Sequence, residues 1–227
     1  NHKVLGVTPE KIGKIAIKRG IPTIIDYFNN KTIKKIISKH GKAKIITATN
    51  VFAHIDNINQ IVKNILKTLK SDGVFISESH YLLPLIQTVQ YDTIYHEHFS
   101  YLSLTSVNEI FKNNGLTIFD VEKIQVHGGS LRYYAQKSDT GRRFISKRVN
   151  ALLKEERDAG LTNLDFYRNF QKVAESIRDE FKNFLIEQKN NGKLIAGYGA
   201  AAKGNTLLNF CNISKALLQF IVDKNPM

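Results

Sequence analysis

Residues 43–76 read AKIITATNVFAHIDNINQIVKNILKTLKSDGVFI, and this stretch decides the fold class. Its first part, Ala43 to Ala48, is a short apolar run typical of a buried strand. Apolar residues then recur at helical spacing from Ile58 to Leu69, Gly73 ends this helix, and Val74 to Ile76 is the next strand. A strand, an amphipathic helix and a second strand form the crossover unit of a parallel sheet.

The same alternation precedes this stretch. The runs Val4 to Val7 and Pro22 to Ile25 indicate two strands, each followed by a helical pattern that ends at a glycine, Gly20 or Gly41. We therefore expect a parallel sheet covered by helices on both faces. In such sheets ligands bind outside the carboxyl ends of the strands. This rule selects three loops as the place of a cofactor: Thr8, Asp26 with Tyr27, and Asn50 to His54.

An aromatic and histidine-rich segment, Tyr91 to Leu104, interrupts the alternation. Its densest cluster is Tyr95-His96-Glu97-His98. In an extended chain His96 and His98 share one face, whereas Tyr95 and Glu97 share the other. Three interpretations remain open: a metal site that needs a third ligand from elsewhere, histidines packed in a loop, and proton transfer by a histidine beside a carboxylate.

The second half of the chain contains a hairpin, a helical segment and a glycine-rich turn. Two strands, Leu116 to Val121 and Ser130 to Ala135, flank the turn His127-Gly128-Gly129 after a short capped helix, Thr105 to Asn113. Residues 139–190 are helical with a break at Gly160, and we place the domain boundary after residue 138.

The chain returns to strand and helix patterns at its end. A strand over Lys193 to Ala196 leads into the turn Gly197 to Gly204, and a strand over Leu217 to Val222 ends at Asp223. Glycines permit close backbone approach, and a helix N-terminus with Lys203 favours phosphate. This is half of a nucleotide-binding unit, and no glycine-rich turn precedes the first strand. We therefore expect a fragment of a longer protein.

The amino-acid composition restricts the class of protein. The 227 residues carry a net charge of +13 and one cysteine, Cys211, which excludes an internal disulfide framework and a cysteine-rich zinc site within the chain. No apolar run approaches membrane-spanning length, so a cytoplasmic protein without a membrane partner is expected. The charge can indicate nucleic-acid binding, but the lysines fall on the polar sides of amphipathic patterns, which favours solvated helix faces. Anionic small molecules would still gain from the positive field.

Three motifs carry a resemblance to a known family: YDTIYHEHFSY at 91–101, HGGSLR at 127–132 and GYGAAAKGNT at 197–206. In this order they resemble the S-adenosylmethionine-dependent sugar C-methyltransferases, which act on nucleotide-linked keto-deoxysugars. The resemblance implies an α/β fold: a Rossmann-like class I methyltransferase domain over 1–138, without its first strand and glycine loop, then a helical segment and a partial Rossmann-like, nucleotide-sugar-binding domain over 139–227. Zinc belongs only to an N-terminal module of that family that lies outside this sequence, and no metal is expected here.

The resemblance also implies a mechanism and roles. A base removes the proton next to the keto group, and the enolate carbon attacks the sulfonium methyl of S-adenosylmethionine. His98 is then the base, helped by Glu97, while Tyr95 and His54 handle protons at the sugar oxygens and the enolate. Together with the strand-end rule, it implies that the cofactor contacts Thr8, Asp26, Tyr27, Asn50 and Val51. The nucleotide sugar is expected to contact Asn50, Arg132, Gly197, Gly199, Lys203 and Asn205.

Two other functions compete with this interpretation. An NAD-dependent oxidoreductase is suggested by Gly197, Gly199 and Asp223, but the turn lacks the GxGxxG spacing of dinucleotide sites. A nucleic-acid-binding module is suggested by the charge alone and has no recognisable motif. We expect an enzyme that acts as a monomer without nucleic acid.

Overall fold

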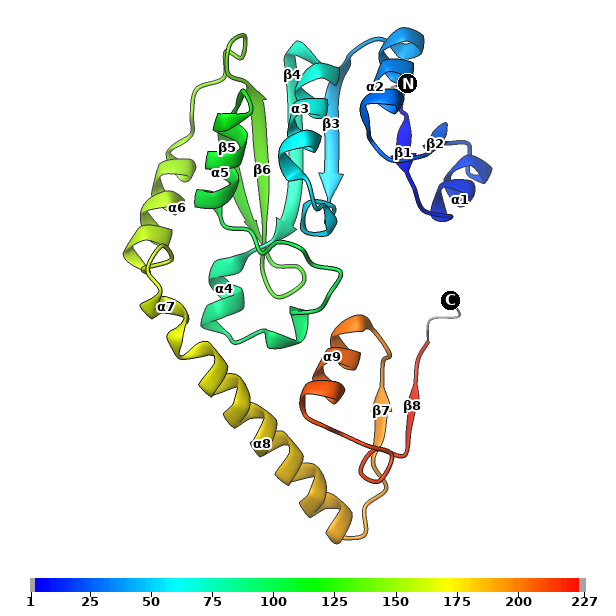
Figure 1. Cartoon of the computed structure of the whole chain (residues 1–227), viewed down its shortest axis with the longest axis vertical. Helices are drawn as coiled ribbons and strands as arrows, with labels where there is room; N and C mark the ends of the chain where they lie inside the picture. Colours follow the sequence, from blue (N-terminus) through cyan, green and yellow to red (C-terminus); the bar gives the residue numbers. More distant parts are fainter. Residues whose placement is uncertain (1–2, 225–227) are drawn as a thin grey trace.

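The computed structural model describes residues 3–224 as three parts (Figure 1). The N-terminal part contains β1 (Gly6–Thr8), α1 (Ile12–Lys18), β2 (Thr23–Ile25) and α2 (Asn30–His40), and β1 pairs with β2 in parallel. Asn29 caps α2, because its side chain accepts hydrogen bonds from the first backbone N–H groups of the helix. Gly41 follows α2 with φ 76°, as the sequence predicts for a helix end at glycine.

A four-stranded sheet forms the middle of the molecule. It contains β3 (Ala43–Thr49), β4 (Leu69–His80), β5 (Leu116–Ile124) and β6 (Ser130–Lys137) in the order β3-β4-β6-β5. β3 and β4 are parallel and are joined through α3 (Ile58–Thr68), whereas β6 is antiparallel to both neighbours. The α/β class is thus confirmed, and the antiparallel pairing of β5 with β6 follows from the predicted hairpin, because a short turn can join only antiparallel strands. The parallel pairs β1–β2 and β3–β4 are also present, but they lie in two separate sheets rather than in the single parallel sheet that was expected.

The boundary between the helix and the second strand within residues 43–76 also differs from the prediction. α3 ends at Thr68 and β4 begins at Leu69, so Gly73 lies inside β4 and does not end the helix. The register between β3 and β4 shifts after Ala43, so four residues bulge out before the regular pairing of Val74. A Cβ on Gly73 would lie 2.7 Å from the Leu69 side chain, which explains a glycine at this position.

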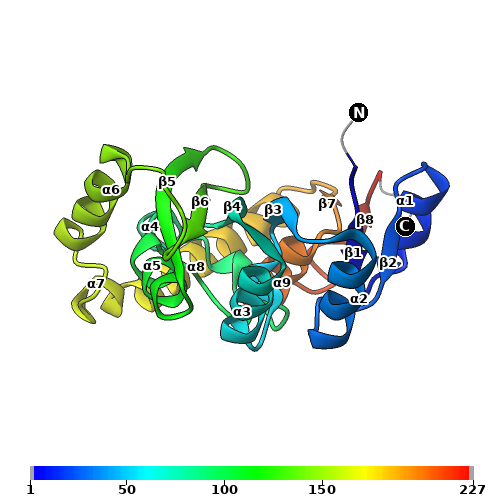
Figure 2. The same ribbon diagram turned by 90° about the horizontal axis from the view of Figure 1, so that it is seen from above.

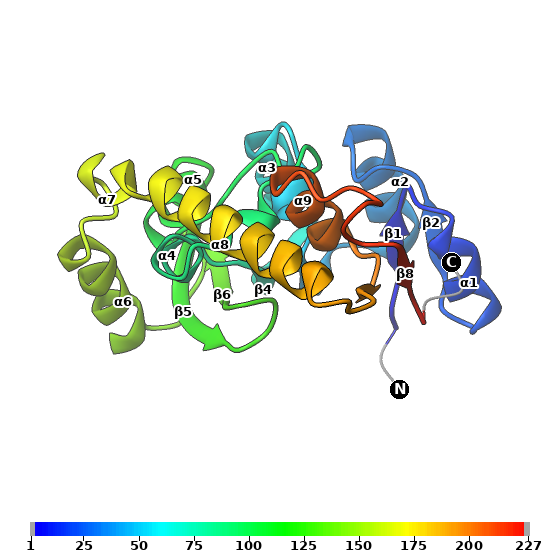
Figure 3. The same cartoon turned by 90° about the horizontal axis from the view of Figure 1, so that it is seen from below.

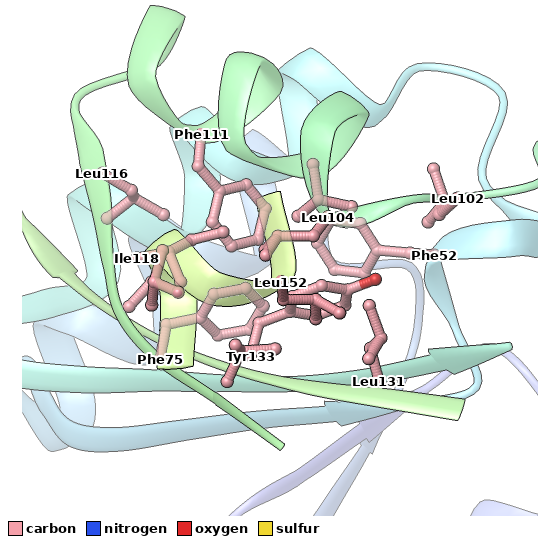
Figure 4. Packing of buried hydrophobic residues seen from close by; sticks show 14 of the residues in the cluster. Phe52, Phe75, Leu102, Leu104, Phe111, Leu116, Ile118, Leu131, Tyr133 and Leu152 are labelled. Carbon is pink, nitrogen blue, oxygen red and sulfur yellow. The ribbon is translucent and has the colours of Figure 1, made fainter. Parts of the chain in front are cut away.

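The main core lies between the sheet and the helices on one of its faces. Figure 4 shows Phe111 and Leu104 from α5 (Leu104–Asn113) facing Phe75 and Tyr133 from the strands. The ring centroids of Phe75 and Phe111 are 5.7 Å apart, and both rings are buried. Each buried ring contributes about 2 kcal/mol by removal from water. This core fixes the sheet whose strand ends carry the loops described below.

α6 (Lys147–Asp158) packs against the same core. Its residues Val149 and Leu152 are buried in the cluster, and the fully buried carboxylate of Glu156 accepts hydrogen bonds from the backbone N–H groups of Leu104 and Thr105 at 2.7 and 2.8 Å. Glu156 therefore caps α5 across 52 residues of sequence. The domain division after residue 138 stays a prediction; α6 lies beyond it and packs on the earlier part.

The C-terminal part extends away from the sheet (Figure 1), and in the view from above α8 lies behind the strands (Figure 2). It contains α7 (Asp165–Arg168), α8 (Phe170–Asn190), β7 (Ala196–Tyr198), α9 (Ala202–Phe210) and β8 (Phe220–Val222), and β7 pairs with β8 in parallel. The view from below shows α8 and α9 beneath the sheet (Figure 3). Within residues 3–224, no helix is both long and apolar enough to cross a membrane.

Candidate functional site

Three histidines converge at the end of β4 and in the loops that follow β3 and β4. His54 lies in the 3-10 helix η1 (Phe52–His54) after β3, and His80 is the last residue of β4. After β4 the chain forms α4 (Leu82–Gln87) and the 3-10 turn η2 (Tyr91–Thr93), and then reaches His98. The site thus lies at the carboxyl ends of parallel strands, where the strand-end rule places ligands.

Hydrogen bonds fix the tautomer of His98. Its Nδ1 lies 3.0 Å from the Thr93 carbonyl oxygen. Because a carbonyl oxygen can only accept, Nδ1 carries a proton, and in the neutral ring Nε2 holds the lone pair. The Tyr95 hydroxyl lies 3.0 Å from Nε2 and donates to it, with the two ring centroids 4.2 Å apart. His98 therefore presents a basic nitrogen that is already aligned with a phenol.

The segment from Tyr95 to His98 forms a turn, whereas the sequence prediction of alternating side-chain faces assumed an extended chain. The backbone N–H of His98 donates to the Tyr95 carbonyl oxygen at 3.0 Å. This turn brings the Tyr95 and His98 side chains together and leaves His96 and Glu97 exposed at its tip. The expectation that His96 and His98 share a face, opposite Tyr95, is therefore wrong.

His54 lies beside His98, with ring centroids 4.9 Å apart. Its Nδ1 lies 2.9 Å from the backbone carbonyl oxygen of Glu97, so Nδ1 again donates and Nε2 keeps the lone pair of the neutral ring. The backbone of Glu97 thus orients His54, while its exposed side chain acts on His98 only as a nearby negative charge.

Burial lowers the pKa of the His98 imidazole below its usual value, and the charges of His54 and Lys203 act in the same direction. The Thr93 hydrogen bond and the Glu97 charge oppose this shift and are outweighed. Burial likewise raises the pKa of Tyr95. At neutral pH the site therefore holds a neutral histidine and a protonated phenol, the pair in which His98 can accept a proton.

His80 is a site residue that the sequence interpretation missed. Its Nε2 lies 2.9 Å from Oε1 of Gln90, whose amide nitrogen donates to the Gly128 carbonyl oxygen at 2.8 Å. His80 and His98 line the same small cavity, and burial lowers the pKa of His80. Because the strand was expected to end at Ile76, the strand-end rule was not applied to residue 80, where it would have selected this histidine.

The residues expected at the cofactor lie at strand ends, as predicted. Thr8 and Asp26 are adjacent, because the Asp26 N–H donates to the Thr8 carbonyl oxygen at 3.0 Å. Tyr27 follows with its ring largely exposed. Asn50 and the exposed Val51 follow β3, and Asn50 has a positive φ of 53°, a conformation that asparagine tolerates better than most residues.

Arg132 is held by carboxylates on its sheet face. Its guanidinium donates to Oε2 of Glu78 at 2.8 and 3.1 Å and lies 3.8 Å from Glu122. Glu78 also contacts a residue expected at the cofactor, because its backbone carbonyl oxygen accepts a hydrogen bond from the Asn50 N–H at 2.8 Å. In this structure the Arg132 charge is thus neutralised by protein groups.

A groove of about 440 Å³ separates the Tyr95–Glu97 turn from α9. Its lining includes Asn205 on α9. Gly197, which the sequence placed in the glycine turn, lies inside β7, and Gly199 follows that strand with a φ of 98°. Lys203 lies in the first turn of α9, near enough to shift the pKa of His98. The lining residues are Tyr95, His96, Glu97, Ala202, Asn205, Thr206, Asn209 and Phe210.

Two observations bear on the competing interpretations. Asp223, which dinucleotide binding would place on a ribose, accepts the Ala200 N–H at 2.5 Å and closes the glycine turn. Within residues 3–224, no group of three or more histidine, cysteine, aspartate or glutamate side chains is arranged to hold a metal ion. His96 and His98 in particular point to different surroundings, since His96 is exposed at the turn.

Known proteins resemble the chain along nearly its whole length. The family described as "Methyltransferase domain" matches residues 7–121, and the family "C-methyltransferase C-terminal domain" matches residues 125–227. The C-methyltransferase NovU of Streptomyces niveus is 34% identical over 222 residues, covering 97% of this chain and 53% of that protein. The chain thus spans about half the length of this relative.

Solved structures resemble it more weakly. A Clostridium acetobutylicum S-adenosylmethionine-dependent methyltransferase is 14% identical with a TM-score of 0.45, covering 60% of this chain and 75% of its own. A Pyrococcus horikoshii protein is 17% identical with a TM-score of 0.47, covering 60% and 72%. The two family matches confirm the relationship that the three sequence motifs indicate. The chain belongs to the methyltransferase family, with a methyltransferase domain followed by the C-terminal domain of the C-methyltransferases.

Proposed function

We propose that the complete protein transfers the methyl group of S-adenosylmethionine to the carbon next to the keto group of a nucleotide-linked keto-deoxysugar. The similarity to NovU and the C-methyltransferase C-terminal domain supports carbon as the acceptor. The single observation that carries the proposal is the His98 tautomer, whose Thr93 hydrogen bond leaves Nε2 as the basic atom. Carbon methylation needs such a base, because the acceptor C–H must first lose its proton.

The residues perform this chemistry in a defined order. His98 Nε2 accepts the proton from the carbon next to the keto group, and the electron pair of that bond moves to the carbonyl oxygen as an enolate. Once Nε2 holds that proton it no longer accepts from Tyr95, whose hydroxyl can then donate to the enolate oxygen and stabilise the developing charge. The Nε2 lone pair of His54 can accept a hydrogen bond from a sugar hydroxyl. S-adenosylmethionine, when bound, would supply an electrophilic methyl group. The enolate carbon would form a bond to that methyl as the methyl–sulfur bond breaks, the carbonyl re-forms and the neutral thioether leaves. Holding both reactants in line provides much of the rate acceleration.

The residues at the strand ends fit the proposed methyl donor. The Asp26 carboxylate is half-buried and can accept hydrogen bonds from ribose hydroxyls, while the exposed Tyr27 ring offers a flat apolar face for an adenine. Thr8 ends β1 of the two-stranded sheet, and Asn50 and Val51 follow β3 of the four-stranded sheet. These groups would bind and orient the donor.

The groove between the two parts fits the proposed acceptor. Its volume of about 440 Å³ lies within the usual range of ligand sites. The Tyr95–Glu97 turn forms one wall and α9 the other, so a sugar at His98 can extend its diphosphate toward Gly197, Gly199, Lys203 and Asn205. Lys203 and the α9 N-terminus favour negative charge there. Arg132 also belongs to this proposal, although Glu78 holds it in the present structure.

The test is product analysis with the complete protein and a donor that carries a ¹³C-labelled methyl group. With a nucleotide-linked keto-deoxysugar as acceptor, the labelled methyl should couple to carbon in the product. A labelled methyl on oxygen or nitrogen, or no transfer to any keto sugar, contradicts the proposal. We place this reaction in the cytoplasm and in a monomer, and the buried thiol of Cys211 is compatible with a reducing compartment.

A further inference from the structure

The turn η2 couples two contacts that lie on opposite sides of it. Its first residue, Tyr91, faces the C-terminal part, and its last residue, Thr93, supplies the carbonyl oxygen that holds His98 Nδ1 at 3.0 Å. Hydrogen bonds from the Thr93 N–H and hydroxyl to the Gln90 carbonyl oxygen, at 3.1 and 2.8 Å, close the turn. Because the turn is a single hydrogen-bonded unit, displacing Tyr91 displaces the Thr93 carbonyl.

Tyr91 is the point at which α9 docks on this turn. The ring centroids of Tyr91 and Phe210 are 4.7 Å apart, and the Tyr91 hydroxyl lies 3.6 Å from Sγ of the fully buried Cys211. Arg178 of α8 covers the Phe210 ring, with its guanidinium carbon 5.7 Å from the ring centroid. Within α9 itself no residue is fully buried, so contacts at its C-terminal end, including this one, fix its position.

We infer that Tyr91 is a positioning residue through which α9 holds the Thr93 carbonyl oxygen against the His98 ring. The C-terminal part then does more than line the groove, because it determines which ring nitrogen of His98 carries the proton. Its meaning for catalysis rests on the proposed function, in which Nε2 is the base. The effect on the His98 tautomer does not rest on it.

The experiment reads the tautomer directly by ¹⁵N NMR of the complete protein labelled at histidine, with the His98→Asn variant used to assign the His98 signals. The unmodified protein should show a proton on Nδ1 and a lone pair on Nε2. In Tyr91→Ala, loss of the ring contact frees η2, so we expect both tautomers of His98 to be populated. In addition, kcat should fall at least about tenfold, with little change in the KM of the methyl donor, whose proposed residues lie on other loops.

Three further variants make the result decisive. Phe210→Ala removes the same contact from the α9 side, leaves Tyr91 in place, and should reproduce the tautomer change even if Tyr91→Ala does not fold. Tyr91→Phe keeps the ring contact and should restore the single tautomer. Tyr167→Ala is the matched control: Tyr167 is half-buried, and its hydroxyl donates to the Leu161 carbonyl oxygen at 2.7 Å, outside η2. It should leave the His98 signals unchanged.

The inference is overturned if Phe210→Ala keeps the proton on Nδ1, if Tyr91→Phe behaves like Tyr91→Ala, or if Tyr167→Ala mixes the tautomers as well. A failure of the proposed reaction gives a different pattern. The tautomer changes would then still appear in the Tyr91 and Phe210 variants, while the unmodified protein would not methylate carbon.

Discussion

The Gln90 side chain donates a hydrogen bond to the Gly128 carbonyl oxygen at 2.8 Å. This contact joins the turn of the β5–β6 hairpin to the segment that precedes η2, across 38 residues of sequence. The same amide orients His80, since its Oε1 lies 2.9 Å from the His80 Nε2. The glycines of the hairpin turn are therefore part of the support of the histidine cluster.

Gly128→Ala should weaken this support. Gly128 has a φ of 82°, and an added Cβ would lie 2.4 Å from Gln90 Oε1, so the Gln90 side chain must move away from His80 and the Gly128 carbonyl oxygen. Gly20→Ala is the matched control, with a φ of 80° and open space around the Cβ. We expect a loss of about 1 kcal/mol in unfolding free energy for Gly20→Ala and about 1–2 kcal/mol more for Gly128→Ala in urea titrations. Equal losses would show that the Gln90 contact is unimportant.

His98→Asn should abolish methyl transfer while both ligands remain bound, because a base acts mainly in the transition state. The expected loss in rate is about a hundredfold to ten-thousandfold. His96→Asn should cost much less, since His96 is exposed at the tip of the turn. The measurement is exchange of the acceptor C–H with deuterated solvent in the absence of the methyl donor. Exchange at the normal rate in His98→Asn, with slow exchange in His96→Asn, would assign the base to His96.

Tyr95→Phe should change the pH dependence of the reaction more than ligand binding. The hydroxyl donates to His98 Nε2 at 3.0 Å, so its removal leaves the lone pair without its partner. We expect kcat to fall about tenfold to a hundredfold and the KM values to change little. The measurement is kcat as a function of pH. A loss confined to KM would indicate that Tyr95 only binds substrate.

Protein stability should rise with pH through the range just below the usual histidine pKa of about 6.5. Burial lowers the folded-state pKa of both His80 and His98, so the unfolded chain binds more protons in this range. This stability is present above the unfolded-state pKa and is lost as the pH falls through the folded-state values. The midpoint of thermal unfolding, measured between about pH 5 and pH 7, should depend less on pH in His80→Asn. An unchanged slope in that variant would contradict the pKa shift.

Glu156→Gln should destabilise the protein strongly. The Glu156 carboxylate is fully buried and accepts hydrogen bonds from two backbone N–H groups and the Thr105 hydroxyl, so an amide leaves at least one donor facing a donor. We expect a loss of about 2–4 kcal/mol in unfolding free energy. Glu155→Gln, next in sequence, removes only an exposed pair with Lys123 and should cost less than about 1 kcal/mol. Similar losses for both variants would contradict the capping role.

The sequence predicted the elements whose apolar pattern is local. α3 was found from helical spacing, α5 as a short capped helix, and the hairpin from the His127-Gly128-Gly129 turn. The strand ends that carry Thr8, Asp26 and Asn50 were placed correctly because each strand is a short apolar run before a polar residue. The methyltransferase family followed from three motifs, which the family matches confirm.

What the sequence did not predict depends on contacts between distant residues. The turn at His98 is stabilised by a backbone hydrogen bond to Tyr95, which no side-chain periodicity reveals. β4 extends to His80 because it pairs with β6 as far as His80 and Ser130. The prediction, which used residue propensities alone, ended this strand at Ile76. The role of Glu156 arises from packing of α6 on α5, and an isolated glutamate in a charged helix gives no signal of burial.

The contact between Tyr91 and Cys211 has a consequence for how the protein is made. The two residues are 120 positions apart, whereas the pairs of the β5–β6 hairpin range from Ile124 with Ser130, 6 positions apart, to Leu116 with Lys137, 21 positions apart. During synthesis the sheet and its hairpin can form while residue 211 is still unmade, because local pairings close early and distant ones late. His98 would therefore acquire its final geometry last, and a nascent chain halted before α9 would be folded in its sheet and yet lack the contact that we infer positions His98.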